Sequence, residues 1–320
     1  KAKEDADKLA EEIKAALLVL DNALRQETDE NAAAERVRQL LNRLQGQLNN
    51  LFTTYTGAND AFDMTEILYR ELHPYLVRSA LAERCTLSPQ GMKNPAKILA
   101  HIMVDQPSGD PPLGQIIDRW LLDRPTINAF RDLQQPAVES VASALPVHRN
   151  RRVLLINAGT GSLVAALNYH LNMAPTVLTV VDQHRDALAW LDMGMTVRPR
   201  QVELQTVQEN LAQFAMGRSR HSFPKQDVIV MSGLLEYLPD RIAFSCLRIA
   251  KELLVHKGTV VLSALSPSDD QILMDRLLNW PTIRRTPSRM LKLMERAGFI
   301  DIRSTPLTAP AMLFSAEADA

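Results

Sequence analysis

The residues best suited to bind a ligand form a glycine-containing turn at 157–162 (NAGTGS), between an apolar run and a helical pattern. Glycine lets the backbone turn sharply and approach a ligand closely, and the first turn of the following helix offers free N–H groups. A G-x-G pair alone is weak evidence, because short glycine turns also serve ordinary strand–helix packing. The candidate cofactor-binding residues of this turn are Asn157, Ala158, Gly159 and Gly161.

A carboxylate, Asp182, ends the next apolar run and is followed by Gln183. In this position a carboxylate can accept hydrogen bonds from both hydroxyls of a ribose. An aspartate at a strand end can also simply cap the following helix. Combined with the glycine turn in a series of alternating strands and helices, the spacing favours nucleoside binding.

Further polar residues follow the third and fourth apolar runs. Glu209 and Asn210 are placed to meet an adenine edge, or equally to lie at a solvated helix start, while Ser232 and Gly233 complete the candidate cofactor set. Val164 occupies the place of the third glycine in the dinucleotide fingerprint, which disfavours NAD. No Lys-Ser/Thr pair follows the turn, so a P-loop is excluded.

The loop after the fourth run, 232–238 (SGLLEYL), carries Glu236 and Tyr237 as candidate catalytic residues. Ligands of open α/β sheets bind beyond the carboxyl ends of the strands. Both side chains therefore lie where a second substrate would approach a bound cofactor. Tyr237 could instead be a core residue, and Glu236 a helix cap.

Apolar, β-branched runs alternate with helical patterns from Arg151 onward, which is typical of a parallel sheet wound on both faces. Two last runs, at 299–303 and 311–314, are separated by a short loop and should pair as an antiparallel hairpin. We expect an α/β fold with a doubly wound, mostly parallel, seven-stranded Rossmann-like sheet. It resembles the class I methyltransferase sheet more than that of a dehydrogenase, whose sixth strand follows another crossover. The parallel strands are expected at 152–157, 176–182, 202–207, 227–232 and 258–264, with helices at 163–171, 186–193, 208–216 and 240–255, and a last helix capped by Thr286.

The residue pattern of the N-terminal half predicts helices. Leucines and other apolar residues recur at steps of three and four over 9–24 and 37–51, and Thr28 or Asp29 can cap the second helix. These two helices should form a hairpin whose apolar stripe packs on its own domain, or instead forms the seam of a homodimer. We expect three domains: a helical hairpin at 1–58, a helical substrate or lid domain at 59–148, and a cofactor-binding domain at 149–320.

Composition narrows the function classes. The formal net charge is −1, with 36 basic and 37 acidic residues, which argues against bulk electrostatic binding of nucleic acid.

Cys85 and Cys246 belong to no CxxC pair and predict reduced, buried thiols of a cytoplasmic protein. The seven histidines lack metal-ligand spacing. No apolar run is long enough to cross a membrane. The charged opening residues resemble the start of a segment inside a longer protein more than a signal peptide.

Several stretches together resemble the methyltransferases assigned to 3-hydroxy fatty acid methyl ester (3-hydroxypalmitate, quorum signal) biosynthesis, over roughly residues 70–305. In that family the corresponding stretches read D-Q-D…A-L, G-L-[FY]-D-Y-L and W…Y-R. The resemblance implies the class I methyltransferase fold, S-adenosylmethionine as cofactor, and an acyl carboxylate, such as that of a hydroxy fatty acid, as acceptor. The matching residues here are Asp182-Gln183 with Ala187-Leu188, then Gly233 to Leu238, then Trp280 and Arg285.

The helical half departs from the family pattern. The family loop K-P-x-G-Y-A-G-D-Y appears here with Met92 in place of its Tyr and Pro95 in place of its Asp, and its R-x-R is reduced to Arg131 with Leu133. These changes predict a different substrate or a loss of catalysis. A carboxylate acceptor would need a cation, for which Arg285, then Arg284 or Arg131, are the candidates.

Two functions remain open on the sequence. The first is an enzyme that transfers a methyl group from S-adenosylmethionine to a small-molecule or acyl acceptor. The second is a protein of this fold that binds S-adenosylmethionine or a partner without catalysis.

Overall fold

The computed structural model describes residues 1–26, 30–87, 95–147, 150–194 and 201–319, and the chain divides into two compact units. The first unit contains Lys1–Lys93, Ala100–Asn128 and Ser268–Thr282, and the second contains the remainder. The segment Ser268–Thr282 thus belongs with the helical N-terminal part, although it follows the fifth strand in sequence. The three domains expected from the sequence stay a prediction.

The first unit begins with three long helices, α1 (Ala2–Gln26), α2 (Glu30–Thr54) and α3 (Ala58–Leu76), and α1 packs against both of the others. The two amphipathic helices predicted here are confirmed, while the predicted caps Thr28 and Asp29 lie outside the described residues. The apolar stripes form the contact between these helices because burying them removes hydrocarbon from water. The buried stripe residues are Leu9, Ile13, Leu17 and Leu24 of α1 and Val37, Leu40, Leu44, Leu48 and Leu51 of α2.

Shorter helices complete this unit. They are α4 (Ala80–Thr86), the second half of α5 (Pro95–Val104), α6 (Leu113–Leu122) and the start of α7 (Pro125–Asp132). The segment Ser268–Thr282 carries a π-helical turn, Leu273–Leu277. Its buried Asp270 accepts hydrogen bonds from Thr126 N (2.8 Å) and Thr126 Oγ1 (2.7 Å), which satisfies the open N-terminus of α7 and ties the segment to the unit.

The second unit is built on a seven-stranded sheet with the order β3-β2-β1-β4-β5-β7-β6. Strands β1 to β5 are parallel, and β7 runs antiparallel to both β5 and β6. The expected sheet and its terminal hairpin are confirmed. The strands are β1 (Arg151–Ile156), β2 (Thr176–Asp182), β3 (Val202–Gln208), β4 (Gln226–Met231), β5 (Leu254–Leu265), β6 (Phe299–Thr305) and β7 (Ala311–Ala318).

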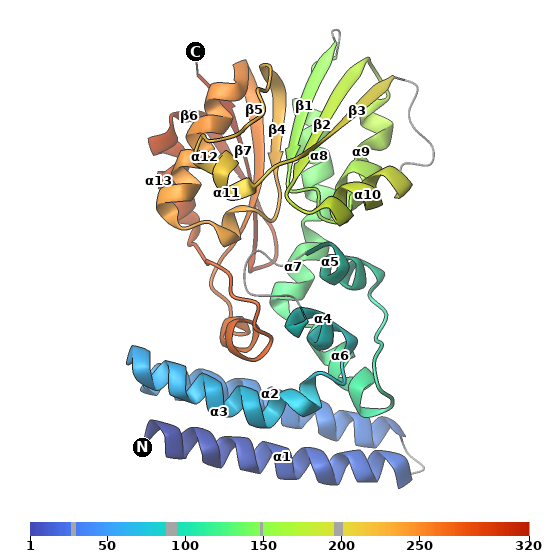
Figure 1. Ribbon diagram of the computed structural model, residues 1–320, viewed down its shortest axis with the longest axis vertical. Coiled ribbons are helices and arrows are strands. Elements are labelled where there is room, and N and C mark those ends of the chain that lie inside the picture. The colour runs from blue at the N-terminus through green and yellow to red at the C-terminus, as the bar shows by residue number, and fades with distance from the viewer. Residues whose placement is uncertain (27–29, 88–94, 148–149, 195–200, 320) are drawn as a thin grey trace. The chain divides into compact units, whose positions relative to one another are not determined.

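Helices cover both faces of this sheet (Figure 1). On one face lie α8 (Gln134–Ala144), α9 (Ser162–Leu171) and α10 (Arg185–Gly194), and on the other lie α11 (Leu211–Ala215), α12 (Asp240–Leu253) and α13 (Pro287–Ala297). The predicted cap of α13 is present, since Thr286 Oγ1 accepts a hydrogen bond from Arg289 N. Helix α11 is shorter than predicted because Asn210 caps it, its side chain accepting from Gln213 N at 2.9 Å.

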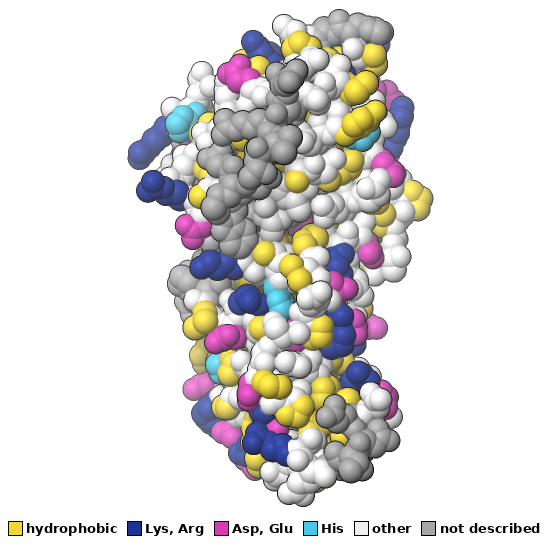
Figure 2. Space-filling model, turned by 90° about the vertical axis from the view of Figure 1, so that its right-hand side faces the viewer, with side chains coloured by type: hydrophobic (Ala, Val, Ile, Leu, Met, Phe, Trp, Pro, Cys, Tyr) yellow, Lys and Arg dark blue, Asp and Glu magenta, His cyan; other side chains and the backbone are white. Residues whose placement is uncertain are grey.

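The surface carries both signs of charge. On the face shown in Figure 2, lysine and arginine side chains are interspersed with aspartate and glutamate. Within the described ranges, no helix combines the length and the apolar character needed to cross a bilayer. Among the same residues, no group of three or more His, Cys, Asp or Glu side chains is gathered as a metal site.

Candidate functional site

The glycine turn lies where the sequence predicts it, between the end of β1 and the start of α9. Asn157, Gly159 and Gly161 have φ angles of 75°, 57° and 74°. This left-handed region is open to glycine and tolerated by asparagine. A Cβ on Gly161 would lie 3.1 Å from Leu191 Cδ1, so both conformation and space favour glycine there.

Two side chains hold the turn in place. Asn157 Nδ2 donates to the carbonyls of Ser232 (3.0 Å) and Gly233 (2.9 Å), which joins the turn to the loop after β4. Asp182 accepts from Ala158 N on one oxygen and from His184 N on the other, both at 2.8 Å. The carboxyl ends of β1, β2 and β4 are therefore joined by hydrogen bonds through this turn.

The carboxyl of Asp182 is completely buried beneath the turn. Burial raises its pKa, and the backbone N–H groups of His184, Ala158 and Gly159 only partly offset that effect. Both oxygens are used to position backbone, so the expected contact with ribose hydroxyls stays a prediction. The next residue, Gln183, is only partly buried and lines a pocket.

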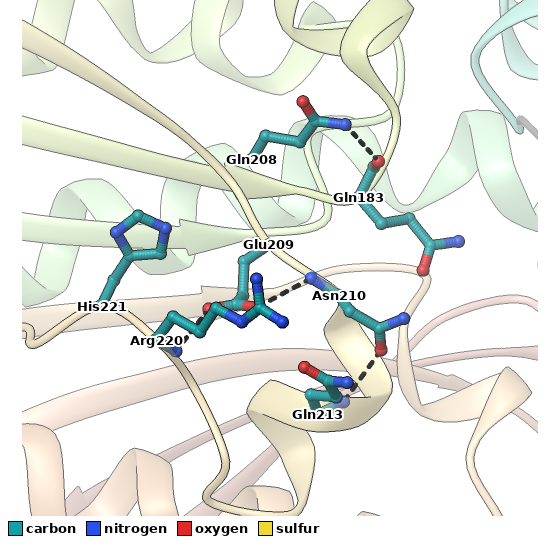
Figure 3. A pocket seen from close by; sticks show the side chains of 7 residues that line it. All are labelled: Gln183, Gln208, Glu209, Asn210, Gln213, Arg220 and His221. Atoms are coloured by element: carbon teal, nitrogen blue, oxygen red, sulfur yellow. Dashed lines mark hydrogen bonds between the residues drawn. The ribbon is translucent and has the colours of Figure 1, made fainter.

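This pocket, of about 430 Å³, lies at the ends of β2 and β3 and is lined by polar side chains (Figure 3). In Figure 3, Gln183 and Asn210 enter it from one side, and Arg220 and His221 from the other. Side-chain amides offer both a donor and an acceptor, which suits the edge of a purine base. The full lining is Gln183, Gln208, Glu209, Asn210, Gln213, Arg220 and His221.

Glu209, one of the two residues expected at an adenine edge, is buried and already bonded within the protein. One of its oxygens accepts from Asn210 N (3.0 Å), and the other accepts from Ser219 Oγ (2.7 Å) and Arg220 N (3.0 Å). Burial acts to raise the pKa of Glu209, but these hydrogen bonds outweigh it and hold the pKa below its usual value. Glu209 thus shapes the pocket wall, while the exposed Asn210 faces solvent.

The loop after β4 lies beside the turn. Gly233 has a φ of 65°, and its N–H donates to Ser263 Oγ on β5 at 2.9 Å. A 3₁₀ turn, Leu235–Tyr237, follows. Within it Tyr237 is partly buried, and its N–H donates to the carbonyl of Leu234. Ser232, Gly233 and Tyr237 are the partly exposed members of the predicted site on this loop.

Glu236 is the most unusual group of the loop. Its side chain is 1% exposed, and neither carboxylate oxygen has a hydrogen-bond partner of good geometry. Burial raises the pKa of Glu236 to about 7, although the charges of Arg284 and Arg285 and the nearby Ser263 hydroxyl act against this rise. Buried polar atoms are nearly always bonded, so this carboxylate calls for an explanation.

Arg285, the cation expected to hold a substrate carboxylate, is also buried. Its Nε donates to Asp240 Oδ1 (2.9 Å), its Nη1 to the carbonyl of Leu235 (2.6 Å), and its Nη2 to the carbonyl of Leu238. Arg289 pairs with the other oxygen of Asp240. The guanidinium therefore stabilises the conformation of the loop after β4. This arrangement does not support the expected role of Arg285 in binding a substrate carboxylate, which stays a prediction.

Some contributors to the site were missed by the sequence analysis. Ser263, Ser219 and Gln213 carry no motif, and Ser263 meets the site from β5, 30 residues after Gly233. A single polar residue at the apolar end of β5 was the only signal for Ser263. Of the positions that depart from the resembling family, Met92 lies outside the described residues, Pro95 begins α5, and Leu133 belongs to the hydrophobic core of the second unit.

Comparison with known proteins places the fold. No family model and no curated protein sequence matches the chain. Among solved structures, the chain is similar to a possible exported protein from Bordetella parapertussis, with 17% identity and a TM-score of 0.55 over 100% of this chain and 97% of that one. It is also similar to the carbon methyltransferase CurJ, with 16% identity and a TM-score of 0.50 over 99% of this chain and 92% of that one. The chain therefore has a class I methyltransferase fold.

Proposed function

We propose that this protein is an S-adenosylmethionine-dependent methyltransferase that binds its cofactor at the glycine turn and the adjoining polar pocket. One observation carries the proposal: in a sheet of methyltransferase order, a turn fixed by Asn157 and Asp182 opens beside a pocket at the ends of β2 and β3. When bound, S-adenosylmethionine supplies an electrophilic methyl group.

The residues present fit this cofactor. Gly159 and Gly161 allow the left-handed backbone of the turn, and the first N–H groups of α9 favour the carboxylate of the cofactor. Gln183 and Asn210 offer amide donors and acceptors to the adenosine part. Asp182 and Glu209 position the residues around them, because their oxygens already accept hydrogen bonds from backbone and side-chain donors of the protein.

The acceptor is a small organic molecule in this proposal. The resemblance to the quorum-signal enzymes favours the carboxylate of a hydroxy fatty acid, and ionised carboxylates need no base. Such an acceptor needs a cation to bind it. Arg285 was the first candidate, and its donors are directed to Asp240 and to the carbonyls of the loop. The fatty acid acceptor is therefore the less supported form of this proposal.

Calorimetry with S-adenosylhomocysteine tests the cofactor. We expect saturable binding to the wild-type chain, weakened about 10-fold by Gln183→Ala, the scale of a lost hydrogen bond. The matched control is Gln135→Ala, an exposed glutamine of α8, which should bind as the wild type does. Preference for NAD, or equal affinity in the Gln183 variant, would overturn the site.

A turnover assay then separates an enzyme from a protein that only binds. The purified chain is incubated with S-adenosylmethionine and a panel of carboxylic acids, alcohols, phenols and amines, and release of S-adenosylhomocysteine is followed. We expect release with at least one acceptor. Tight cofactor binding without release for any acceptor would favour the binding-protein function instead.

A further inference from the structure

The two carboxylate oxygens of Glu236 are buried and lack protein hydrogen-bond partners of good geometry. The residue is 1% exposed, so its oxygens have almost no contact with bulk solvent. An unpaired buried acceptor costs on the order of 1–3 kcal/mol, and more when it is charged. A ligand that donates to such a group removes this cost, because the carboxylate has already lost its contact with bulk solvent on folding.

Glu236 is close to the candidate cofactor turn through a continuous set of contacts. Asn157 on the turn bonds the carbonyl of Gly233, and the N–H of Gly233 bonds Ser263. The hydroxyl of Ser263 in turn lies beside Glu236. Gly233 adds no side chain between the turn and this loop, and a Cβ there would lie 3.5 Å from Asn157 Nδ2.

The negative charge of Glu236 itself disfavours an anionic acceptor. The cations Arg284 and Arg285 act on Glu236 and favour its ionised form. Arg285 donates to Asp240 and to the carbonyls of Leu235 and Leu238, so each of its three nitrogens already has a partner within the protein. A substrate carboxylate would bring a second anion next to Glu236, and two adjacent carboxylates resist being ionised together.

We infer that the methyl acceptor is a neutral hydroxyl or amine that donates its hydrogen to the carboxylate of Glu236, which takes up the proton during transfer. This inference rests on the proposed methyltransferase function and names the acceptor class of the same site. The S–CH₃ bond breaks with its electron pair staying on sulfur, and a lone pair of the acceptor oxygen or nitrogen forms the new bond to carbon. The proton of the acceptor goes to Glu236 and leaves to water after product release.

Probes with identical tails and different head groups test the acceptor class. The first set is octanol, octylamine and octanoate, and the second is phenol, aniline and benzoate. We expect S-adenosylhomocysteine release with a hydroxyl or amine probe and none with octanoate or benzoate. Glu236→Gln should lower kcat/KM for the accepted probe by about 10²–10⁴-fold, the usual contribution of a general base. Glu295→Gln, an exposed glutamate of α13, is the matched control and should leave kcat/KM unchanged.

A binding measurement without turnover provides a second readout. With S-adenosylhomocysteine bound, Glu236→Gln should tighten the binding of octanoate or benzoate about 10-fold, because a like charge is removed. It should weaken, or leave unchanged, the binding of the neutral probes. A purely structural role for Glu236 would change the binding of anionic and neutral probes alike.

The outcomes separate this inference from the function on which it rests. Failure of S-adenosylhomocysteine to bind the wild-type chain overturns both. Cofactor binding together with methylation of octanoate or benzoate overturns the acceptor class and leaves the methyltransferase function standing. Cofactor binding without release for any hydroxyl or amine probe, or full turnover by the Glu236→Gln variant, also overturns the acceptor class.

Discussion

Replacing Glu236 with glutamine should change how the stability of the fold depends on pH. Burial raises the pKa of Glu236 from 4.5 to about 7 in the folded chain. A carboxyl whose pKa is higher in the folded state binds its proton more tightly there, so protonation favours folding. This contribution is fully present below pH 4.5 and is lost as the pH rises through about 7. Glutamine is neutral throughout and has no such dependence.

The magnitude follows from the two pKa values. The difference between 4.5 and about 7 corresponds to about 3 kcal/mol, at roughly 1.4 kcal/mol per pH unit. The free energy of unfolding of Glu236→Gln, relative to the wild type, should therefore rise by about 3 kcal/mol between about pH 4.5 and about pH 8. Any constant difference in packing between the two side chains does not depend on pH and cancels from this comparison.

Urea unfolding followed by circular dichroism, repeated across this pH range, measures the difference. Glu295→Gln, which removes an exposed carboxyl from α13, is the control and should show less than about 0.5 kcal/mol of change. A difference between Glu236→Gln and the wild type that stays constant with pH would show that Glu236 is not buried without partners in solution. A variant that becomes relatively less stable at high pH would reverse the sign and refute the reasoning.

Three further predictions concern the supports of the site and the N-terminal helices. Asp182→Ala removes the acceptor of Ala158 N and His184 N and should weaken S-adenosylhomocysteine binding by about 1.5–3 kcal/mol in calorimetry, whereas Asp132→Ala on the surface should not. Arg285→Ala should lower the free energy of unfolding by about 2–4 kcal/mol, against less than about 1 kcal/mol for Arg289→Ala, which loses only the outer partner of Asp240. Deleting residues 1–52 should expose the apolar face of α3 and lower solubility, and a truncated chain that stays soluble, monomeric and equally stable would show these helices to be dispensable.

The sheet was predictable because its signals are local. Each parallel strand is a short β-branched run with a helical pattern after it, and the last two runs are too close in sequence for a crossover. The turn at 157–162 was predictable for the same reason, since glycines between a strand and a helix report a backbone requirement. The segment Ser268–Thr282 was not, because its place in the helical unit depends on contacts such as Asp270 with Thr126.

The hydrogen-bond partners of the site side chains could not be predicted from the sequence either. The strand-end position of Asp182 predicts a ribose contact, but it does not predict that the two oxygens accept from Ala158 N and His184 N. Two of the partners of Glu209 come from the loop before β4, and two of those of Arg285 are backbone carbonyls, which have no sequence signature. Periodicity reports which face of an element is buried, but not which donor an acceptor meets there.

The three carboxyls at this edge of the sheet are treated differently by the fold, and the difference bears on function. Asp182 and Glu209 each accept hydrogen bonds from at least two donors of the protein. These bonds stabilise the turn and the pocket wall. Glu236 is similarly buried, but neither of its oxygens has a hydrogen-bond partner of good geometry, although the Ser263 hydroxyl lies nearby. A carboxyl with a pKa of about 7 can both hold and release a proton near neutral pH. If the site transfers a methyl group to a protonated acceptor, the proton needs a base, and of these three groups Glu236 is the one whose surroundings suit that role.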